Sequence, residues 1–129
     1  MTRFAAGRER VSRRRHPETL HVGAFLAGKL VAVASVCHEP PPGERDAAAW
    51  RVRGMATLPE QRGRGLGGKL LEHCLQHARA LGGRRLWCSA RVAVAAFYHA
   101  WGFVSVGEPF VLPQYSEEPY IRMEHHLAG

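Results

Sequence analysis

The glycine-rich stretch RGRGLGG, residues 62–68, constrains the fold of this chain more than any other feature. It places four glycines and two arginines within seven positions. Glycine at this density costs backbone entropy and lets the main chain approach another group closely, while arginine favours anions. An extended apolar stretch, 50–58, ends at Pro59 before the loop, and apolar residues at helical spacing follow it. A strand, a glycine turn and a helix N-terminus form an anion site, so the loop indicates an α/β protein that binds phosphate.

Two known phosphate loops match these letters incompletely. The G-x-G-x-x-G spacing that starts at Gly63 fits the dinucleotide fingerprint, but the next strand, 86–90, carries no acidic residue for a ribose. The same stretch fits a nucleoside-triphosphate loop only until Leu70, where that loop needs a hydroxyl for Mg²⁺. A third possibility is a pyrophosphate held without metal or ribose contacts.

The other apolar patterns predict one domain with a mixed α/β sheet. A loop is expected at 39–44, where three prolines interrupt the pattern. Strands are expected at 20–25, 30–37, 50–58, 86–90, 103–106 and 120–127, and helices at 66–81 and 93–101. Strands therefore come first, followed by alternating strands and helices.

The formal charge of +7 raises the question of nucleic-acid binding. Six arginines lie in the first fifteen residues, but no aromatic residue beyond Phe4 is interleaved with them. This pattern is typical of a solvated tail, so we expect no specific nucleic-acid partner. No apolar run reaches the length of a membrane span, and three scattered cysteines indicate reduced thiols. We therefore expect a cytoplasmic protein without a membrane partner.

Two motifs carry a family resemblance. Arg62-x-x-Gly65-x-Gly67 follows directly after a strand, and residues 95–103, AAFYHAWGF, place an aromatic-Tyr pair before Gly-Phe. Their order and separation resemble those of the GCN5-related N-acetyltransferases (GNAT family), over roughly residues 50–106. The resemblance implies a GNAT-like fold, a central mixed and mostly antiparallel sheet flanked by helices, with a shortened N-terminal part. It also implies acetyl-coenzyme A (acetyl-CoA) as co-substrate, with no metal.

The same resemblance implies roles for individual residues. A primary amine of an unknown small molecule or peptide would attack the thioester directly, and Tyr98 would be the general acid that protonates the leaving thiolate. The alternative for Tyr98 is a place in a core aromatic cluster with Phe97, Trp101 and Phe103. For Lys69, a contact with the cofactor phosphates and an outward orientation toward solvent are equally compatible with the sequence. The cofactor-binding residues implied by the family are Met55, Ala56, Thr57, Arg62, Gly63, Arg64, Gly65, Leu66, Gly67 and Gly68.

The chain departs from the family pattern at its N-terminus and in its active-site strands. Only about nineteen residues precede the first hairpin, too few for the strand and helices that wall the acceptor site in relatives. We divide the chain into a basic segment, 1–19, either disordered or a remnant of those elements, and an acetyltransferase-like domain, 20–129. The acceptor side would then be open, completed by a homodimer partner, or lost through truncation. A non-catalytic CoA-binding module is the alternative to an enzyme.

The sequence assigns no definite functional role to several polar residues near the motifs. The strands 50–58 and 86–90 hold no Asp or Glu, so a water chain, Glu108 or a C-terminal histidine is left as general base. Arg91 stands where relatives commonly carry Asn. His73 and His77 have a metal-compatible spacing, but they are read as part of a solvated helix face. Cys88 is interpreted as a buried strand residue rather than a nucleophile.

Overall fold

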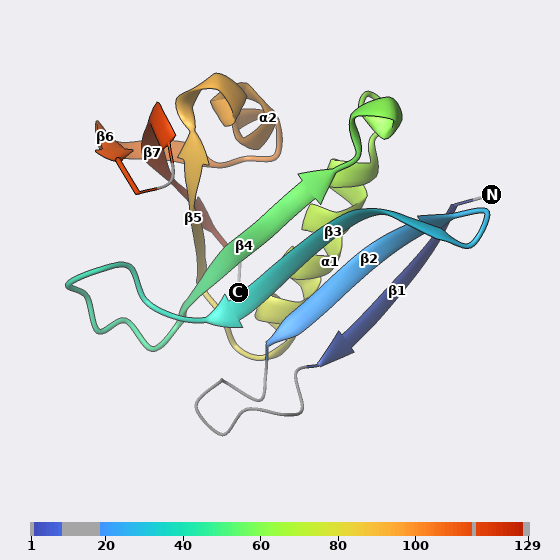
Figure 1. The fold of residues 1–129 in the computed structure, drawn as a ribbon. Helices are drawn as coiled ribbons and strands as arrows, with labels where there is room; N and C mark the ends of the chain where they lie inside the picture. Colours follow the sequence, from blue (N-terminus) through green and yellow to red (C-terminus); the bar gives the residue numbers. More distant parts are fainter. Residues whose placement is uncertain (1, 9–18, 115, 128–129) are drawn as a thin grey trace.

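The computed structural model describes residues 2–8, 19–114 and 116–127, and a seven-stranded sheet forms its centre (Figure 1). The sheet order is β1-β2-β3-β4-β5-β7-β6, and neighbouring strands are antiparallel except β4 and β5. The predicted mixed, mostly antiparallel sheet flanked by helices is confirmed. The strands are β1 (Thr2–Arg8), β2 (Leu20–Leu26), β3 (Lys29–His38), β4 (Ala49–Thr57), β5 (Arg85–Arg91), β6 (Val104–Leu112) and β7 (Ser116–His126).

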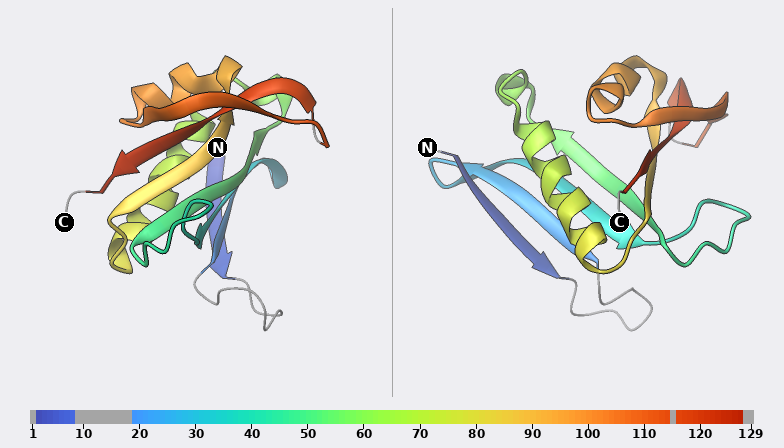
Figure 2. Two further views of the ribbon diagram at one scale, coloured as in Figure 1. Left: turned by 90° about the vertical axis from the view of Figure 1, so that its left-hand side faces the viewer. Right: turned by 180° about the vertical axis from the view of Figure 1, so that it is seen from behind.

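Two α-helices accompany the sheet in the described residues, α1 (Leu66–Ala80) and α2 (Ala95–Ala100). Each follows a short 3-10 helix, η1 (Pro59–Gln61) and η2 (Val92–Val94). Helix α1 lies across one face of β2, β3 and β4 (Figure 2). Its inward side chains Leu70, Leu71, Cys74 and Ala78 have no exposed surface, which accounts for the apolar spacing in the sequence. No helix in these described ranges is long and apolar enough to cross a membrane.

The parallel pair in the middle of the sheet is joined over only a short length. Residues 49–51 of β4 pair with residues 85–87 of β5, yet β4 continues to Thr57 and β5 to Arg91. Past the paired residues the two strands diverge, as Figure 1 shows. Gly54 contributes a bulge to β4, because it has a φ of 61° at the point where one residue of β3, Ala34, opposes two of β4, Gly54 and Met55. A glycine inside a strand often marks such a bulge.

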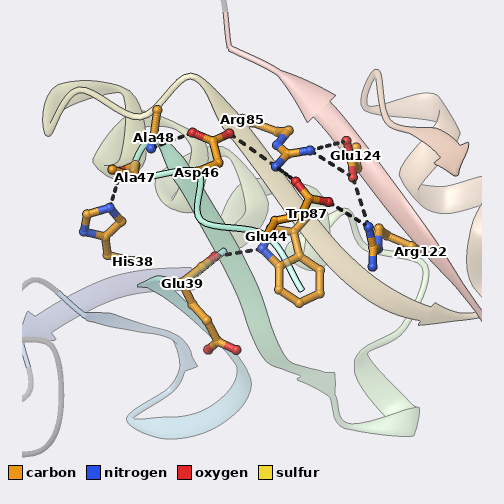
Figure 3. A network of polar contacts seen from close by, with 10 residues as sticks. All are labelled: His38, Glu39, Glu44, Asp46, Ala47, Ala48, Arg85, Trp87, Arg122 and Glu124. Atoms are coloured by element: carbon orange, nitrogen blue, oxygen red, sulfur yellow. Dashed lines mark hydrogen bonds and ion pairs between the residues drawn. The ribbon is translucent and has the colours of Figure 1, made fainter. Parts of the chain in front are cut away.

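Five charged side chains anchor the loop between β3 and β4 (Figure 3). They lie at the end of the sheet where β4 and β5 are paired. Arg85 bonds to Glu44, and its guanidinium also lies 3.2 Å from Asp46 and 3.3 Å from Glu124. Arg122 adds contacts of 3.3 Å to Glu44 and 3.8 Å to Glu124. Since the side chain of Glu124 is only 8% exposed, it depends on these partners. We call these five residues the Arg85 cluster.

The structure differs from the sequence prediction at both ends of the chain. Thr2–Arg8 forms strand β1, which pairs with β2 along its length, whereas the sequence predicts no strand before residue 20. Backbone hydrogen bonds to β2 hold this edge strand. Its sequence, TRFAAGR, has no run of β-branched residues from which a strand could be predicted. Residues 9–18, which belong to the same predicted basic segment, lie outside the described residues.

The last two strands are longer than predicted. Strand β6 continues past 106 to Leu112, although Gly107 and Pro109 are strand-breaking residues. Its register against β7 shifts between Val106 and Phe110, so an irregularity absorbs both residues within the strand. The helix predicted at 93–101 is divided between η2 and α2.

Candidate active site

Three neighbouring cavities extend from the glycine-rich loop into the divergence between β4 and β5. The loop cavity, about 260 Å³, lies against residues 61–63 and 65–68. The middle cavity, about 490 Å³, lies against the end of β4, and the inner cavity, about 390 Å³, lies between β4 and β5. The loop and middle cavities share Thr57, Arg62, Gly67 and Phe97. The middle and inner cavities share Met55, Arg91, Val94 and Tyr98.

The loop cavity is built by the backbone of the glycine-rich loop. Gly63 and Gly65 have φ values of 82° and 77°, a left-handed conformation that other residues rarely adopt. Gly65 is the N-cap of α1 and supplies no side chain to bond the first-turn amides. Those amides have no acceptor within the helix, and the helix dipole adds partial positive charge there. The loop cavity therefore presents backbone donors suited to a phosphate.

Two glycines of the α1 first turn also have a packing role. A Cβ atom on Gly68 would lie 2.4 Å from Cζ2 of Trp101, and one on Gly67 would lie 3.3 Å from Cζ of Phe97. The absence of side chains lets α1 pack closely against α2. For Gly68, which is buried, this contact explains the glycine without any ligand.

Nearly all the residues predicted to bind the cofactor lie along these cavities. The middle cavity is lined by Met55, Ala56, Thr57, Arg62 and Gly67. The loop cavity is lined by Thr57, Arg62, Gly63, Gly65, Leu66, Gly67 and Gly68. Arg64 is exposed and is not a lining residue of the three cavities, and Lys69 also points to solvent.

Tyr98 lies where the middle and inner cavities meet. Its ring packs edge-on against Phe97 and Phe103, two of the three residues of the alternative aromatic cluster, at centroid distances of 5.0 and 5.3 Å. Its hydroxyl points away from that cluster, 3.7 Å from Sδ of Met55. Burial, reinforced by the neighbouring Cys88, raises the pKa of Tyr98 well above the usual value near 10. The phenol is therefore protonated at neutral pH and can donate a proton.

Cys88 adjoins Tyr98 on the inner cavity, but its chemistry is that of a core residue. The side chain is 2% exposed, and burial raises the pKa of its thiol to about 12. A thiol of this kind is not ionised at neutral pH and is a weak nucleophile. The interpretation of Cys88 as a buried strand residue is confirmed.

The two histidines of α1 pack against aromatic rings. The centroid of His73 lies 5.7 Å from that of Phe4, and His77 lies edge-on to Trp50, also at 5.7 Å. Both are half-buried, so the helix face predicted to be solvated is partly covered at these two positions. Across residues 2–8, 19–114 and 116–127, no three His, Cys, Asp or Glu side chains gather as a metal site.

The inner cavity has a strongly basic lining that the sequence interpretation did not include. Arg51 and Arg53 line it from β4, and Arg91 lines it from the end of β5. No Asp or Glu is among its lining residues, and neither Glu108 nor a C-terminal histidine borders it. The alternation of Trp50 and Val52 with the two arginines was a usable signal, because it places both arginines on the strand face opposite α1.

Comparisons with known proteins identify the family of this fold. The model of the acetyltransferase (GNAT) family matches residues 3–103. The uncharacterized N-acetyltransferase YitI of Bacillus subtilis (strain 168) is 36% identical over 95 residues, which span 74% of this chain and 64% of that protein. The crystal structure of an acyl-CoA N-acyltransferase from Pseudomonas aeruginosa is 29% identical, covers 83% of this chain and 68% of its own, and superposes with a TM-score of 0.66. An aminoglycoside 6'-N-acetyltransferase complexed with coenzyme A has the same fold, with a TM-score of 0.70 at 16% identity over 88% of this chain and 75% of its own. The chain belongs to the acetyltransferase (GNAT) family.

Proposed function

We propose that the chain is an acetyl-CoA-dependent N-acetyltransferase that acts on a primary amine, with Tyr98 as the general acid. The observation that carries the proposal is the position of the Tyr98 hydroxyl, at the junction of the middle and inner cavities. A proton donor is needed where the cofactor sulfur and the amine come together. Tyr98 is the protonated hydroxyl that both cavities share.

The residues present fit coenzyme A. The uncapped amides of α1 and the left-handed glycines suit its pyrophosphate, and Arg62 lies where the loop and middle cavities meet. The end of β4, which has no strand partner on its β5 side, suits the amide groups of the pantetheine arm. When bound, acetyl-CoA supplies the acetyl thioester. The family relationship and the coenzyme A complex of the aminoglycoside acetyltransferase support this assignment.

The basic inner cavity offers a reason why no general base is required there. An amine that enters it lies near Arg51, Arg53 and Arg91. Nearby positive charge disfavours the ammonium form and lowers the pKa of the amine. The ammonium would therefore lose its first proton to water before the attack, and the nitrogen would lose a second proton to water after it bonds to the thioester carbon.

The test is the substitution Tyr98→Phe, which keeps the ring in its aromatic cluster and removes only the hydroxyl. A general acid contributes about 10²–10⁴-fold, so turnover should fall by that order while the affinity for acetyl-CoA stays the same. The assay is thiol release from acetyl-CoA with a panel of small amines and peptide N-termini. Tyr120→Phe removes a hydroxyl from the inner cavity alone and should reduce turnover far less.

Two results would reject the proposal. Equal turnover in the wild type and Tyr98→Phe would remove Tyr98 from the mechanism. A wild-type protein that binds acetyl-CoA but acetylates no amine of the panel would instead be a non-catalytic CoA-binding module.

A further inference from the structure

We infer that the acceptor is an amine that also carries an anionic group, a carboxylate or a phosphate, held by the arginines of the inner cavity. The inference rests on the proposed function, because it assigns the inner cavity to the acceptor. The chemistry of the lining carries it: Arg51, Arg53 and Arg91 border one space of about 390 Å³ without any lining carboxylate.

The divergence of β4 and β5 brings these arginines to two sides of the same cavity. Arg51 and Arg53 are two residues apart on β4, so their side chains leave the same face of the strand. Arg91 is the last residue of β5, beyond the paired segment 85–87. An anion between the strands would therefore meet guanidinium groups from both walls.

The carboxylates near these arginines neutralise them only in part. Glu39 pairs with Arg51 at 3.0 Å and with Arg53 at 4.0 Å, and Glu118 pairs with Arg91 at 3.6 Å. Three guanidinium groups against two carboxylates leave one positive charge in excess. Each guanidinium has five N–H donors, so these ion pairs use only part of the available donors. The remaining donors can hold a carboxylate or phosphate through paired bonds.

One of the three arginines is fixed in place before any ligand arrives. The guanidinium of Arg51 lies 4.7 Å from the ring centre of Trp87, and the indole N–H of Trp87 donates to the Glu39 carbonyl at 2.8 Å (Figure 3). The carboxylate of Glu39 in turn bonds to Arg51. The side chains of Arg53 and Arg91 are about half exposed, at 50% and 53%, and can adjust to a ligand. The site thus combines one rigid cation with two adaptable ones.

The same lining disfavours a second positive charge on the acceptor. A diamine or a lysine-rich peptide would bring an ammonium group close to three guanidinium groups with no carboxylate among the lining residues to receive it. Like charges placed together reduce the affinity for the wrong partner, which gives selectivity beyond what attraction alone provides.

The kinetic test uses primary amines that differ mainly at the far end. These are 4-aminobutyrate, phosphoethanolamine, the neutral 4-aminobutanamide and the cationic putrescine. We expect kcat/KM to be highest for one of the two anionic amines, which also separates carboxylate from phosphate recognition. Arg53→Gln should lower that value about tenfold more than it lowers the value for the neutral amide, since only the anionic amine also loses a charged hydrogen bond. Arg84→Gln removes one charge from the opposite end of β5 and should change neither value.

A binding test decides the inference without requiring turnover. Glutarate and inorganic phosphate should raise the melting temperature of the coenzyme A complex, while glutaramide should not. Arg53→Gln and Arg91→Gln should reduce the anion effect, with coenzyme A affinity measured separately because Arg91 also borders the middle cavity.

The inference is overturned if neither anion stabilises the complex, if the variants respond as the wild type does, or if putrescine is the best acceptor. In the last case the proposed acetyltransferase function would still stand.

Discussion

Tyr98 combines a structural and a chemical position in one side chain. The ring is 7% exposed and closes the aromatic cluster, while the hydroxyl reaches the junction of two cavities. The burial that fixes the ring also keeps the phenol protonated, because an ionised phenolate would lose its hydration.

This burial predicts the shape of the pH profile. A general acid works only while protonated, and the raised pKa of Tyr98 shifts the loss of its proton to a higher pH than usual. Initial rates with saturating acetyl-CoA should therefore rise as the amine substrate deprotonates and should not fall between pH 8 and about 10, the usual phenol pKa. An alkaline limb centred below pH 10 that disappears in Tyr98→Phe would contradict the raised pKa.

Sequence alone identified individual residues unevenly. Motif spacing singled out Tyr98 and the loop glycines, and these residues line the cavities. Arg51 and Arg53 were not found, since an arginine on a strand face is ordinarily a solvated side chain. Only the separation of β4 from β5, a property of the folded sheet, makes their shared face into the wall of a cavity.

In the proposed function, cofactor binding depends most directly on the N-terminal turn of α1. Gly65 has a positive φ and empty space around the position of a Cβ atom, so its requirement is backbone conformation and access. Gly82, just beyond the other end of α1, has a φ of 87° and similar empty space. The two glycines therefore form a matched pair for substitution.

We expect Gly65→Asp to abolish the increase in melting temperature that acetyl-CoA gives the wild type. The substitution adds a carboxylate where backbone amides should meet phosphate, and the two negative charges repel. Gly82→Asp introduces the same strain and charge at the far end of α1 and should retain the full increase. Thermal unfolding with and without acetyl-CoA measures both. An unchanged increase in Gly65→Asp would locate the phosphate elsewhere.

Elements with strong local signals were predicted well, and those without were not. The β2–β3 hairpin and α1 follow apolar alternation and helical spacing closely. Strand β1 and the extension of β6 depend on pairing with β2 and β7, and their own sequences give weak signals. Tertiary pairing overrides local propensity in such strands.

At the scale of the whole molecule, three buried thiols couple stability to pH. Burial raises the pKa of Cys37 to about 11 and the pKa values of Cys74 and Cys88 to about 12, from an ordinary value near 9. For Cys37 the neighbouring Glu39 adds to the effect. All three thiols are free. Between pH 9 and 12 the unfolded chain loses thiol protons that the folded protein retains, so unfolding releases protons.

The free energy of unfolding should therefore fall as pH rises above 9. Each thiol contributes a slope of at most about 1.4 kcal/mol per pH unit, and its stabilising effect is complete only below pH 9. Urea denaturation under reducing conditions at pH 8, 9 and 10 measures this slope. Cys74→Ala should be less stable at every pH, because it leaves a cavity, but its slope should be shallower than that of the wild type. Parallel curves for the two proteins would show that Cys74 does not ionise on unfolding.

The short pairing of β4 and β5 has a mechanical consequence. The sheet consists of two halves, β1–β4 with α1 and β5–β7 with α2. Three residue pairs between β4 and β5 join these halves. The Arg85 cluster links the two halves beside these residue pairs. The diverging ends of β4 and β5 form no backbone hydrogen bonds to one another. A small rotation of one half about the paired residues would change the distance between the diverging ends of β4 and β5 without breaking a strand pair. Contacts across the opening, where α1 packs against α2 and the Tyr98 hydroxyl lies 3.7 Å from Sδ of Met55, would set its width together with the Arg85 cluster.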